Sequence, residues 1–93
     1  MKACPARNPN LAWREIDGEI MIISPEDSQV HELNETASWI WKHFDGTQSP
    51  DAIAARLAAA FDVEMETARQ HIVELIEVLD KKRLIAVAAE EKN

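Results

Sequence analysis

The first third of the chain alternates apolar and polar positions in a way that predicts three short β-strands. Residues 11–16 and 19–24 are rich in β-forming side chains and flank Asp17-Gly18, a dipeptide that suits a two-residue type I′ hairpin turn. A proline-containing turn over Ser24–Ser28 leads into Gln29–Leu33, where polar and apolar residues alternate again. The pattern predicts a three-stranded antiparallel meander whose last strand lies at an edge.

The rest of the chain changes to helical spacing and predicts three helices. Apolar residues recur at intervals of three and four in three segments. The first runs from Glu35 to about Phe44, the second starts at Pro50 and has the stripe Ile53, Leu57 and Phe61, and the third runs from about Met65 to Lys82. Asn34 and Ser49 suit the N-caps of the first two helices, and Gly46 suits a left-handed C-cap after the first. Residues 84–87 are expected to form a short strand or a packed tail.

The order of the predicted elements indicates an α+β fold of winged helix-turn-helix-like type, a three-stranded antiparallel meander followed by three helices that cover one face of it. A chain of 93 residues has room for one hydrophobic core and little room for a cofactor cleft beside it. We expect a single domain over residues 11–87, a flexible lead-in over 1–10 and a flexible acidic tail over 88–93.

Charge and hydropathy exclude several classes of partner. The net charge of −7 argues against nucleic acid, because binding to nucleic acid depends mainly on neutralising phosphates. No apolar run approaches the ~20 residues that span a bilayer, and the first ten residues lack a signal-peptide core. We therefore expect a cytoplasmic protein that binds neither nucleic acid nor membrane, and whose partner is a neutral or basic peptide.

No pattern of catalytic or metal-binding residues stands out. His31, His43 and His71 are widely separated and have no cysteine or paired carboxylate near them in the sequence. A Gly-rich phosphate loop, a nucleophile elbow and a Cys-x-x-Cys motif are also absent from the sequence. The sequence therefore predicts a protein that is not an enzyme and holds no metal or cofactor.

A set of positions in the helical part carries a family resemblance. The set reads Leu33-Asn34-x-Thr36-Ala37-x-x-Ile40-Trp41-x-x-x-Asp45-Gly46, then Ile53, Leu57, Phe61-x-Val63, Leu79 and Leu84-Ile85. It resembles the PqqD family. The resemblance implies a recognition element that holds the leader of a ribosomally made precursor peptide for a modifying enzyme, often a radical S-adenosylmethionine (radical SAM) enzyme. The pathway would be pyrroloquinoline quinone (PQQ) biosynthesis or a related peptide modification, a RiPP pathway.

The same residues suggest where a peptide would bind. An edge strand offers unpaired N–H and C=O groups to which an extended peptide can add as a further strand. The resemblance implies that the guest strand lies along the third strand and against the third helix. On that helix, roughly 100° of rotation per residue places three residues beyond the core stripe on one side. The predicted peptide-binding residues are Gln29, Val30, His31, Glu32, Leu33, Arg69, Val73 and Ile76.

The sequence also predicts a contact role for Trp39 and leaves two alternative functions open. Trp39 projects away from Trp41 on the first helix, so we expect it to be exposed and to contact the modifying enzyme or a second copy. A winged-helix DNA-binding regulator has the same element order, although its recognition helix would be acidic. A structural subunit whose open strand pairs with its own copy, forming a homodimer, is the other alternative.

Overall fold

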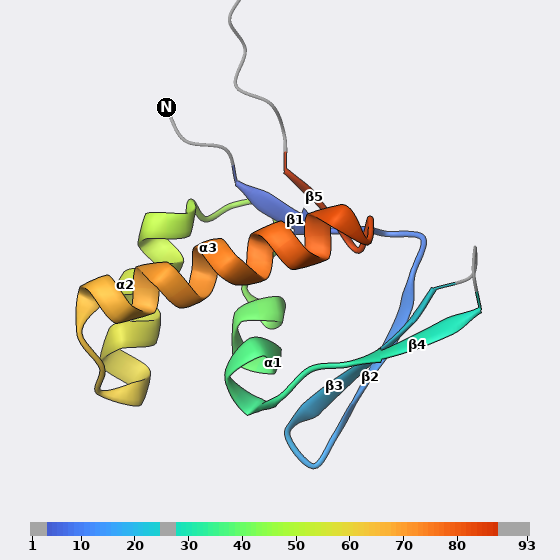
Figure 1. The fold of residues 1–93 in the computed structure, drawn as a ribbon, viewed down its shortest axis with the longest axis horizontal. Coiled ribbons are helices and arrows are strands. Elements are labelled where there is room, and N and C mark those ends of the chain that lie inside the picture. Colours follow the sequence, from blue (N-terminus) through green and yellow to red (C-terminus); the bar gives the residue numbers. More distant parts are fainter. Residues whose placement is uncertain (1–3, 25–27, 88–93) are drawn as a thin grey trace, which may run out of the picture.

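The computed structural model describes residues 4–24 and 28–87, which form five strands and three helices (Figure 1). In chain order the elements are β1 (Pro5–Arg7), β2 (Ala12–Ile16), β3 (Glu19–Ser24), β4 (Gln29–Glu32), α1 (Glu35–Lys42), α2 (Pro50–Phe61), α3 (Met65–Lys81) and β5 (Ile85–Val87). The α+β architecture with a three-stranded sheet and three helices is the predicted one.

Strands β2, β3 and β4 form the antiparallel meander that the alternating pattern predicts. Asp17 and Gly18 have φ angles of 54° and 85°, and two positive φ angles are what a type I′ hairpin turn requires. In the described part of the chain β4 has a strand neighbour on one side only, so it is an edge strand as expected. The turn predicted over Ser24–Ser28 includes residues 25–27, which lie outside the described residues.

Strand β1 was not predicted, because residues 1–10 were expected to be a flexible lead-in. Pro5–Arg7 instead pairs antiparallel with β5, so that both ends of the described chain meet in a second, two-stranded sheet. A three-residue strand has no measurable alternation, and its partner is at the other end of the sequence. The predicted tail over residues 88–93 lies outside the described residues.

Helix α1 ends two residues before the predicted Phe44, and Gly46 is not its C-cap. The cap residue is His43, which keeps right-handed backbone angles, and the Arg7 guanidinium donates hydrogen bonds of 3.0 Å to the carbonyls of Trp41 and Lys42. Gly46 does have a positive φ of 83°, but its N–H donates to the Pro5 carbonyl at 2.9 Å. The left-handed glycine therefore joins the chain to β1 instead of ending a helix.

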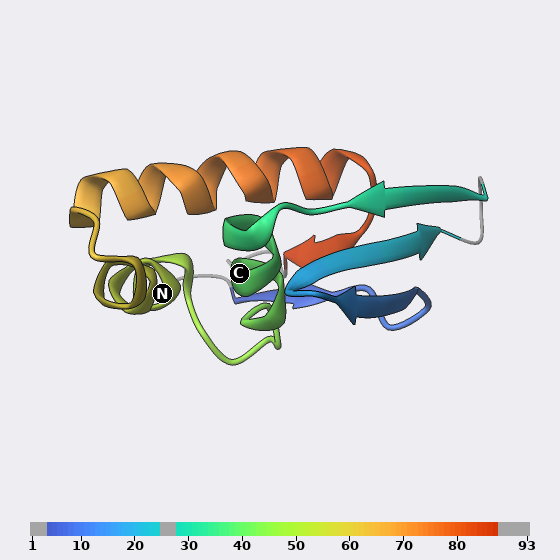
Figure 2. The same ribbon diagram turned by 90° about the horizontal axis from the view of Figure 1, so that it is seen from below.

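Helices α2 and α3 form a hairpin that extends away from the three-stranded sheet. Ser49 caps α2 as predicted, with its hydroxyl accepting from the Ala52 N–H at 3.2 Å. Helix α2 packs on α3, whereas α1 packs on β3 (Figures 1 and 2). The prediction that all three helices cover the sheet is therefore wrong for α2, since helical spacing shows which face is apolar but not what it meets.

The core fills the space between the sheet, α1 and the α2–α3 hairpin. Its fully buried apolar side chains include Ile20, Ile22, Ile40, Trp41, Phe44, Ile53, Leu57, Ile72, Leu79 and Leu84. Trp13 packs edge-on against Trp41 with ring centroids 6.1 Å apart, and joins β2 to this core.

A buried hydroxyl links the sheet to α1. Ser38 is fully buried; its Oγ accepts a 2.7 Å hydrogen bond from the Ile20 N–H and donates a 3.1 Å bond to the Leu33 carbonyl. Ile20 and Leu33 face each other where β4 leaves the sheet, and the Leu33 N–H donates to the Ile20 carbonyl at 2.9 Å. The hydroxyl thus replaces the second ladder bond of this pair.

We expect Ser38→Ala to lower the free energy of unfolding by about 1–3 kcal/mol, because it leaves a buried N–H and a buried C=O without partners. Urea denaturation followed by circular dichroism measures the loss. Thr67→Ala, which removes a hydroxyl from an exposed position of α3, is the matched control. Equal stability of the two variants would show that the Ser38 bridge contributes nothing.

Candidate functional site: an open strand edge beside a groove

The outer edge of β4 carries backbone groups that point away from the sheet. The Leu33 N–H bonds to β3, and in an antiparallel ladder alternate residues face the partner strand. His31 therefore also faces β3, and Val30 and Glu32 direct their N–H and C=O groups to the open side. These two residues form a hydrogen-bonding edge ready for one more strand.

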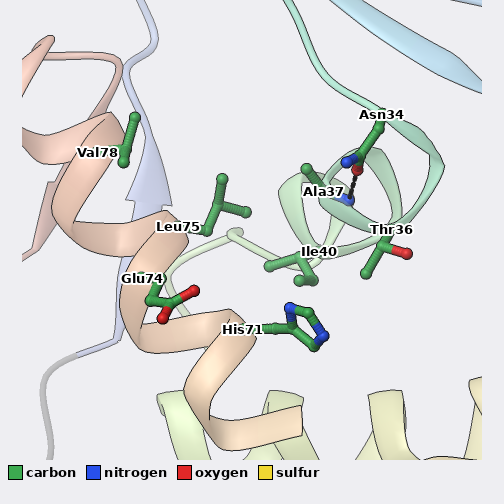
Figure 3. Close-up of a pocket in the computed structure, with 8 residues that line it drawn as sticks. All are labelled: Asn34, Thr36, Ala37, Ile40, His71, Glu74, Leu75 and Val78. Atoms are coloured by element: carbon green, nitrogen blue, oxygen red, sulfur yellow. Dashed lines mark hydrogen bonds between the residues drawn. The ribbon is translucent and has the colours of Figure 1, made fainter. Parts of the chain in front are cut away.

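A groove runs between this edge and α3. One cavity of about 310 Å³ lies between α1 and α3 and is lined by Asn34, Thr36, Ala37, Ile40, His71, Glu74, Leu75 and Val78 (Figure 3). A second cavity of about 210 Å³ is lined by His31, Glu32, Leu33, Leu75, Val78, Leu79, Lys82 and Leu84. Leu75 and Val78 line both cavities, so we treat them as one feature, the β4–α3 groove.

The capped start of α1 shapes one end of the groove. The Asn34 side-chain oxygen accepts from the Ala37 N–H at 2.8 Å, which ends β4 and begins α1 within two residues (Figure 3). One helical turn later, Ile40 is only 1% exposed and closes the bottom of the cavity. The cap therefore fixes the angle between the strand edge and the first wall of the groove.

Helix α3 supplies the facing wall, and it is apolar. Leu75 is half-buried and Val78 is 49% exposed, a large exposure for an apolar side chain beside a cavity. Figure 3 shows Leu75 directed toward α1 from α3. This wall offers apolar surface that an occupant of the groove would remove from water.

Charged and polar side chains lie at the two ends of the groove. His71 and Glu74 are at the α1 end, where Gln70 donates to the Glu74 carboxylate at 3.2 Å. His31 and Lys82 are at the other end. An apolar middle with polar ends, beside unpaired backbone groups, is suited to an extended peptide segment.

The predicted strand residues Gln29–Leu33 do lie along the edge and the groove, but their parts differ. The His31 side chain lines the groove, whereas Glu32 borders it only at the strand edge, because the side chains of Val30 and Glu32 point to the opposite face of the sheet. Val30 is 53% exposed on that face. Leu33 belongs to the core at 9% exposure, and both its backbone groups are already bonded. Leu33 is therefore a wall of the groove and offers no edge bonds.

The three residues predicted on the third helix do not line the β4–α3 groove. Arg69 forms an ion pair with Asp51 at 3.2 Å that ties the start of α2 to α3, and a second with Glu66 at 3.0 Å within α3. Val73 is 43% exposed and Ile76 packs against the core. All three lie on the flank of α3 opposite to His71, Leu75 and Val78.

The rotation of α3 about its own axis explains why these three residues do not line the groove. Periodicity correctly placed the buried stripe, which includes Ala68, Ile72 and Leu79. It could not decide which flank of that stripe faces β4, because the packing of α3 on α2 and β5 is a tertiary property. Leu75 and Val78 are apolar beside the stripe, just as Val73 and Ile76 are, so the sequence contains no signal that separates the two flanks.

Trp39 is not the exposed side chain that was expected. It is partly buried between α1 and α2, stacked on the His43 ring at 3.9 Å and edge-on to Phe61 at 5.8 Å. The side of α1 opposite to Trp41 faces α2, which the wheel projection of α1 alone does not show. A contact between Trp39 and another protein would engage only its remaining exposed part.

Within residues 4–24 and 28–87, no group of three or more His, Cys, Asp and Glu side chains is arranged to hold a metal ion. In the same part of the chain, no helix is both long and apolar enough to cross a membrane.

The chain is similar in sequence to proteins of one family. Residues 19–85 match the family model for coenzyme PQQ synthesis protein D (PqqD). The PqqA binding protein of Xanthomonas campestris pv. campestris (strain 8004) is 37% identical over 85 residues, which cover 89% of this chain and 90% of the relative. The PqqA binding protein of Xanthomonas oryzae pv. oryzae (strain PXO99A) is 37% identical over 65 residues, 70% of this chain and 68% of that protein.

Solved structures share the fold at low sequence identity. TbiB1 in complex with the TbiA(beta) leader peptide superposes with a TM-score of 0.81 at 19% identity, covering 91% of this chain and 99% of that one. The PqqD truncation of Methylobacterium extorquens PqqCD, a stand-alone RiPP recognition element, gives a TM-score of 0.74 at 20% identity and covers 88% and 87%.

Proposed function

The chain belongs to the PqqD family, and from this premise we propose that it is a peptide-binding module that holds the leader of a ribosomally made precursor by strand addition. The observation that carries the proposal is the open edge of β4 beside the β4–α3 groove. A guest strand bonds to the outward backbone groups of Val30 and Glu32, and its side chains reach the groove.

The alternation of a β-strand divides the guest residues between two environments. Side chains of one parity point toward α3 and enter the groove, where Leu75 and Val78 favour apolar residues. Side chains of the other parity lie beside Val30 and Glu32 on the outer face of the sheet. The backbone bonds hold any extended peptide, and the groove provides the selectivity.

The proposed ligand is a leader of the PqqA kind, because the relatives that cover most of this chain are PqqA binding proteins. The net charge of −7 favours encounter with a neutral or basic segment of that leader. A precursor made on ribosomes is first available in the cytoplasm, so we propose that the module works there.

The module's role toward a modifying enzyme follows from tethering. A peptide held at β4 has its downstream part at a high effective concentration near any enzyme that also binds the module. We propose that this enzyme performs the chemistry, that a radical SAM enzyme of PQQ or related RiPP biosynthesis is the first candidate, and that this chain is not itself catalytic.

Strand addition predicts a particular pattern of amide protection. In a complex with synthetic Xanthomonas campestris PqqA, the amides of Val30 and Glu32 should exchange with solvent at least about ten times more slowly than in the free chain. The amide of Leu33 should change little, because it is already bonded to Ile20. Hydrogen exchange followed by NMR on the labelled chain measures both, and unchanged exchange at Val30 and Glu32 under saturation would contradict strand addition.

The groove is tested by the same substitution on the two flanks of α3. Val78→Asp should weaken PqqA binding about tenfold or more, because it places a charge where an apolar guest side chain is desolvated. Val73→Asp should leave the dissociation constant within about twofold, since Val73 has similar exposure but lies away from the groove.

Isothermal titration calorimetry gives the two affinities, and thermal melts check that both variants are folded. Weak binding by the Val73 variant with normal binding by the Val78 variant would place the peptide on the flank that the sequence predicted.

A further inference from the structure

One row of side chains on α3 borders the β4–α3 groove along its length. Glu74, Val78 and Lys82 are spaced four residues apart, and residues four apart are neighbours on the surface of a helix. Glu74 lines the cavity at the α1 end, Lys82 lines the cavity at the other end, and Val78 lines both. The row therefore presents a negative, an apolar and a positive group to the groove, in that order.

The spacing of this row matches the spacing of side chains on a strand. Four residues of helix rise by about 6 Å, and side chains on one face of a β-strand recur about every 6.8 Å. A guest strand on β4 turns every second side chain toward α3. Three successive side chains of that face can therefore meet the three members of the row one to one, with a mismatch of about 1.6 Å over the whole row.

The two charged members of the row are available to a ligand. Both are exposed, and no ion pair among residues 4–24 and 28–87 involves either of them. The surroundings keep the two ends opposite in sign. Lys81 and Arg83 flank Lys82, whereas Glu35, in the first turn of α1, offsets the positive end of that short helix near Glu74.

The directions of β4 and α3 determine which end of a guest strand meets which charge. His31 in β4 lines the same cavity as Lys82, whereas Asn34, which follows β4, lines the same cavity as Glu74. Figure 2 shows the two elements running in opposite directions. A guest antiparallel to β4, the pairing that is slightly more stable per residue, therefore runs along α3 from Glu74 to Lys82.

We propose that the groove selects a peptide by the order of its charges. From N- to C-terminus, the ligand has a basic residue beside Glu74, an apolar residue two positions later beside Val78, and an acidic residue two positions after that beside Lys82. This rests on the proposed peptide function and adds the class of peptide. The reversed order brings like charges together at both ends, so the residues that attract one order repel the other.

Two peptides of the same composition test the order of charges. Thr-Val-Lys-Thr-Leu-Thr-Glu-Val-Thr carries the proposed order, and a second peptide has its Lys and Glu exchanged. Fluorescence anisotropy of the labelled peptides should give the first a dissociation constant about tenfold or more lower, because the exchange turns two attractions into two repulsions. The preference should shrink as salt is added.

An exchange of charges in the protein tests the two residues. The double variant Glu74→Lys with Lys82→Glu keeps the net charge and should reverse the preference between the two peptides. Glu77→Lys with Lys81→Glu makes the same exchange on α3, at exposed positions that line neither cavity. This control should keep the preference within about twofold of the parent, and thermal melts check that both variants are folded.

The order of charges is overturned if the parent chain binds PqqA but binds the two peptides equally, prefers the exchanged one or binds neither. It is also overturned if the variant of Glu74 and Lys82 keeps the parent's preference, or if the control exchange shifts the preference equally. All of these results leave the proposed function standing. Failure to bind PqqA as well as both peptides would instead overturn the proposed function, and the order of charges with it.

Discussion

The buried hydroxyl of Ser38 is the interaction on which the arrangement of the site depends. Where β4 leaves the sheet to become α1, the ladder between β3 and β4 loses its last bond, and the hydroxyl bridges the two strands instead. Because Ser38 is itself in the second turn of α1, the bridge fixes the helix to the sheet. The Asn34 cap then sets the direction of the chain between them.

The Ser38 and Asn34 hydrogen bonds hold the open edge of β4 in a fixed position relative to α1. An edge strand in water invites any extended segment, and proteins usually protect such edges. Here β4 is short, Leu33 directly after it is held in the core, and α3 stands beside it as a wall. In the proposed complex, a segment that pairs with this edge must also fit its side chains into the β4–α3 groove, which would turn a general backbone interaction into a selective one.

The three-stranded sheet has different uses for its edge and its two faces. The inner face forms the core with α1, the β4 edge and the groove form the proposed peptide site, and the outer face carries the exposed Ile16, Ile23 and Val30. These surfaces meet only at β4, whose alternate residues serve the groove and the outer face in turn.

The sequence by itself determined the local elements. Periods of two and of three to four, the Asp17-Gly18 turn, and the Asn34 and Ser49 caps act over a few residues, so they predicted the meander, the three helices and the edge position of β4. Only the tertiary structure decided which helices and strands pack against one another. The pairing of β1 with β5 joins the two ends of the described chain, and the packing of α3 on α2 and β5 makes Val78 a groove residue and turns Val73 away from the groove. The physical reason is that a helix or strand shows its own apolar face in its spacing, whereas the partner of that face is set by the packing of the whole chain.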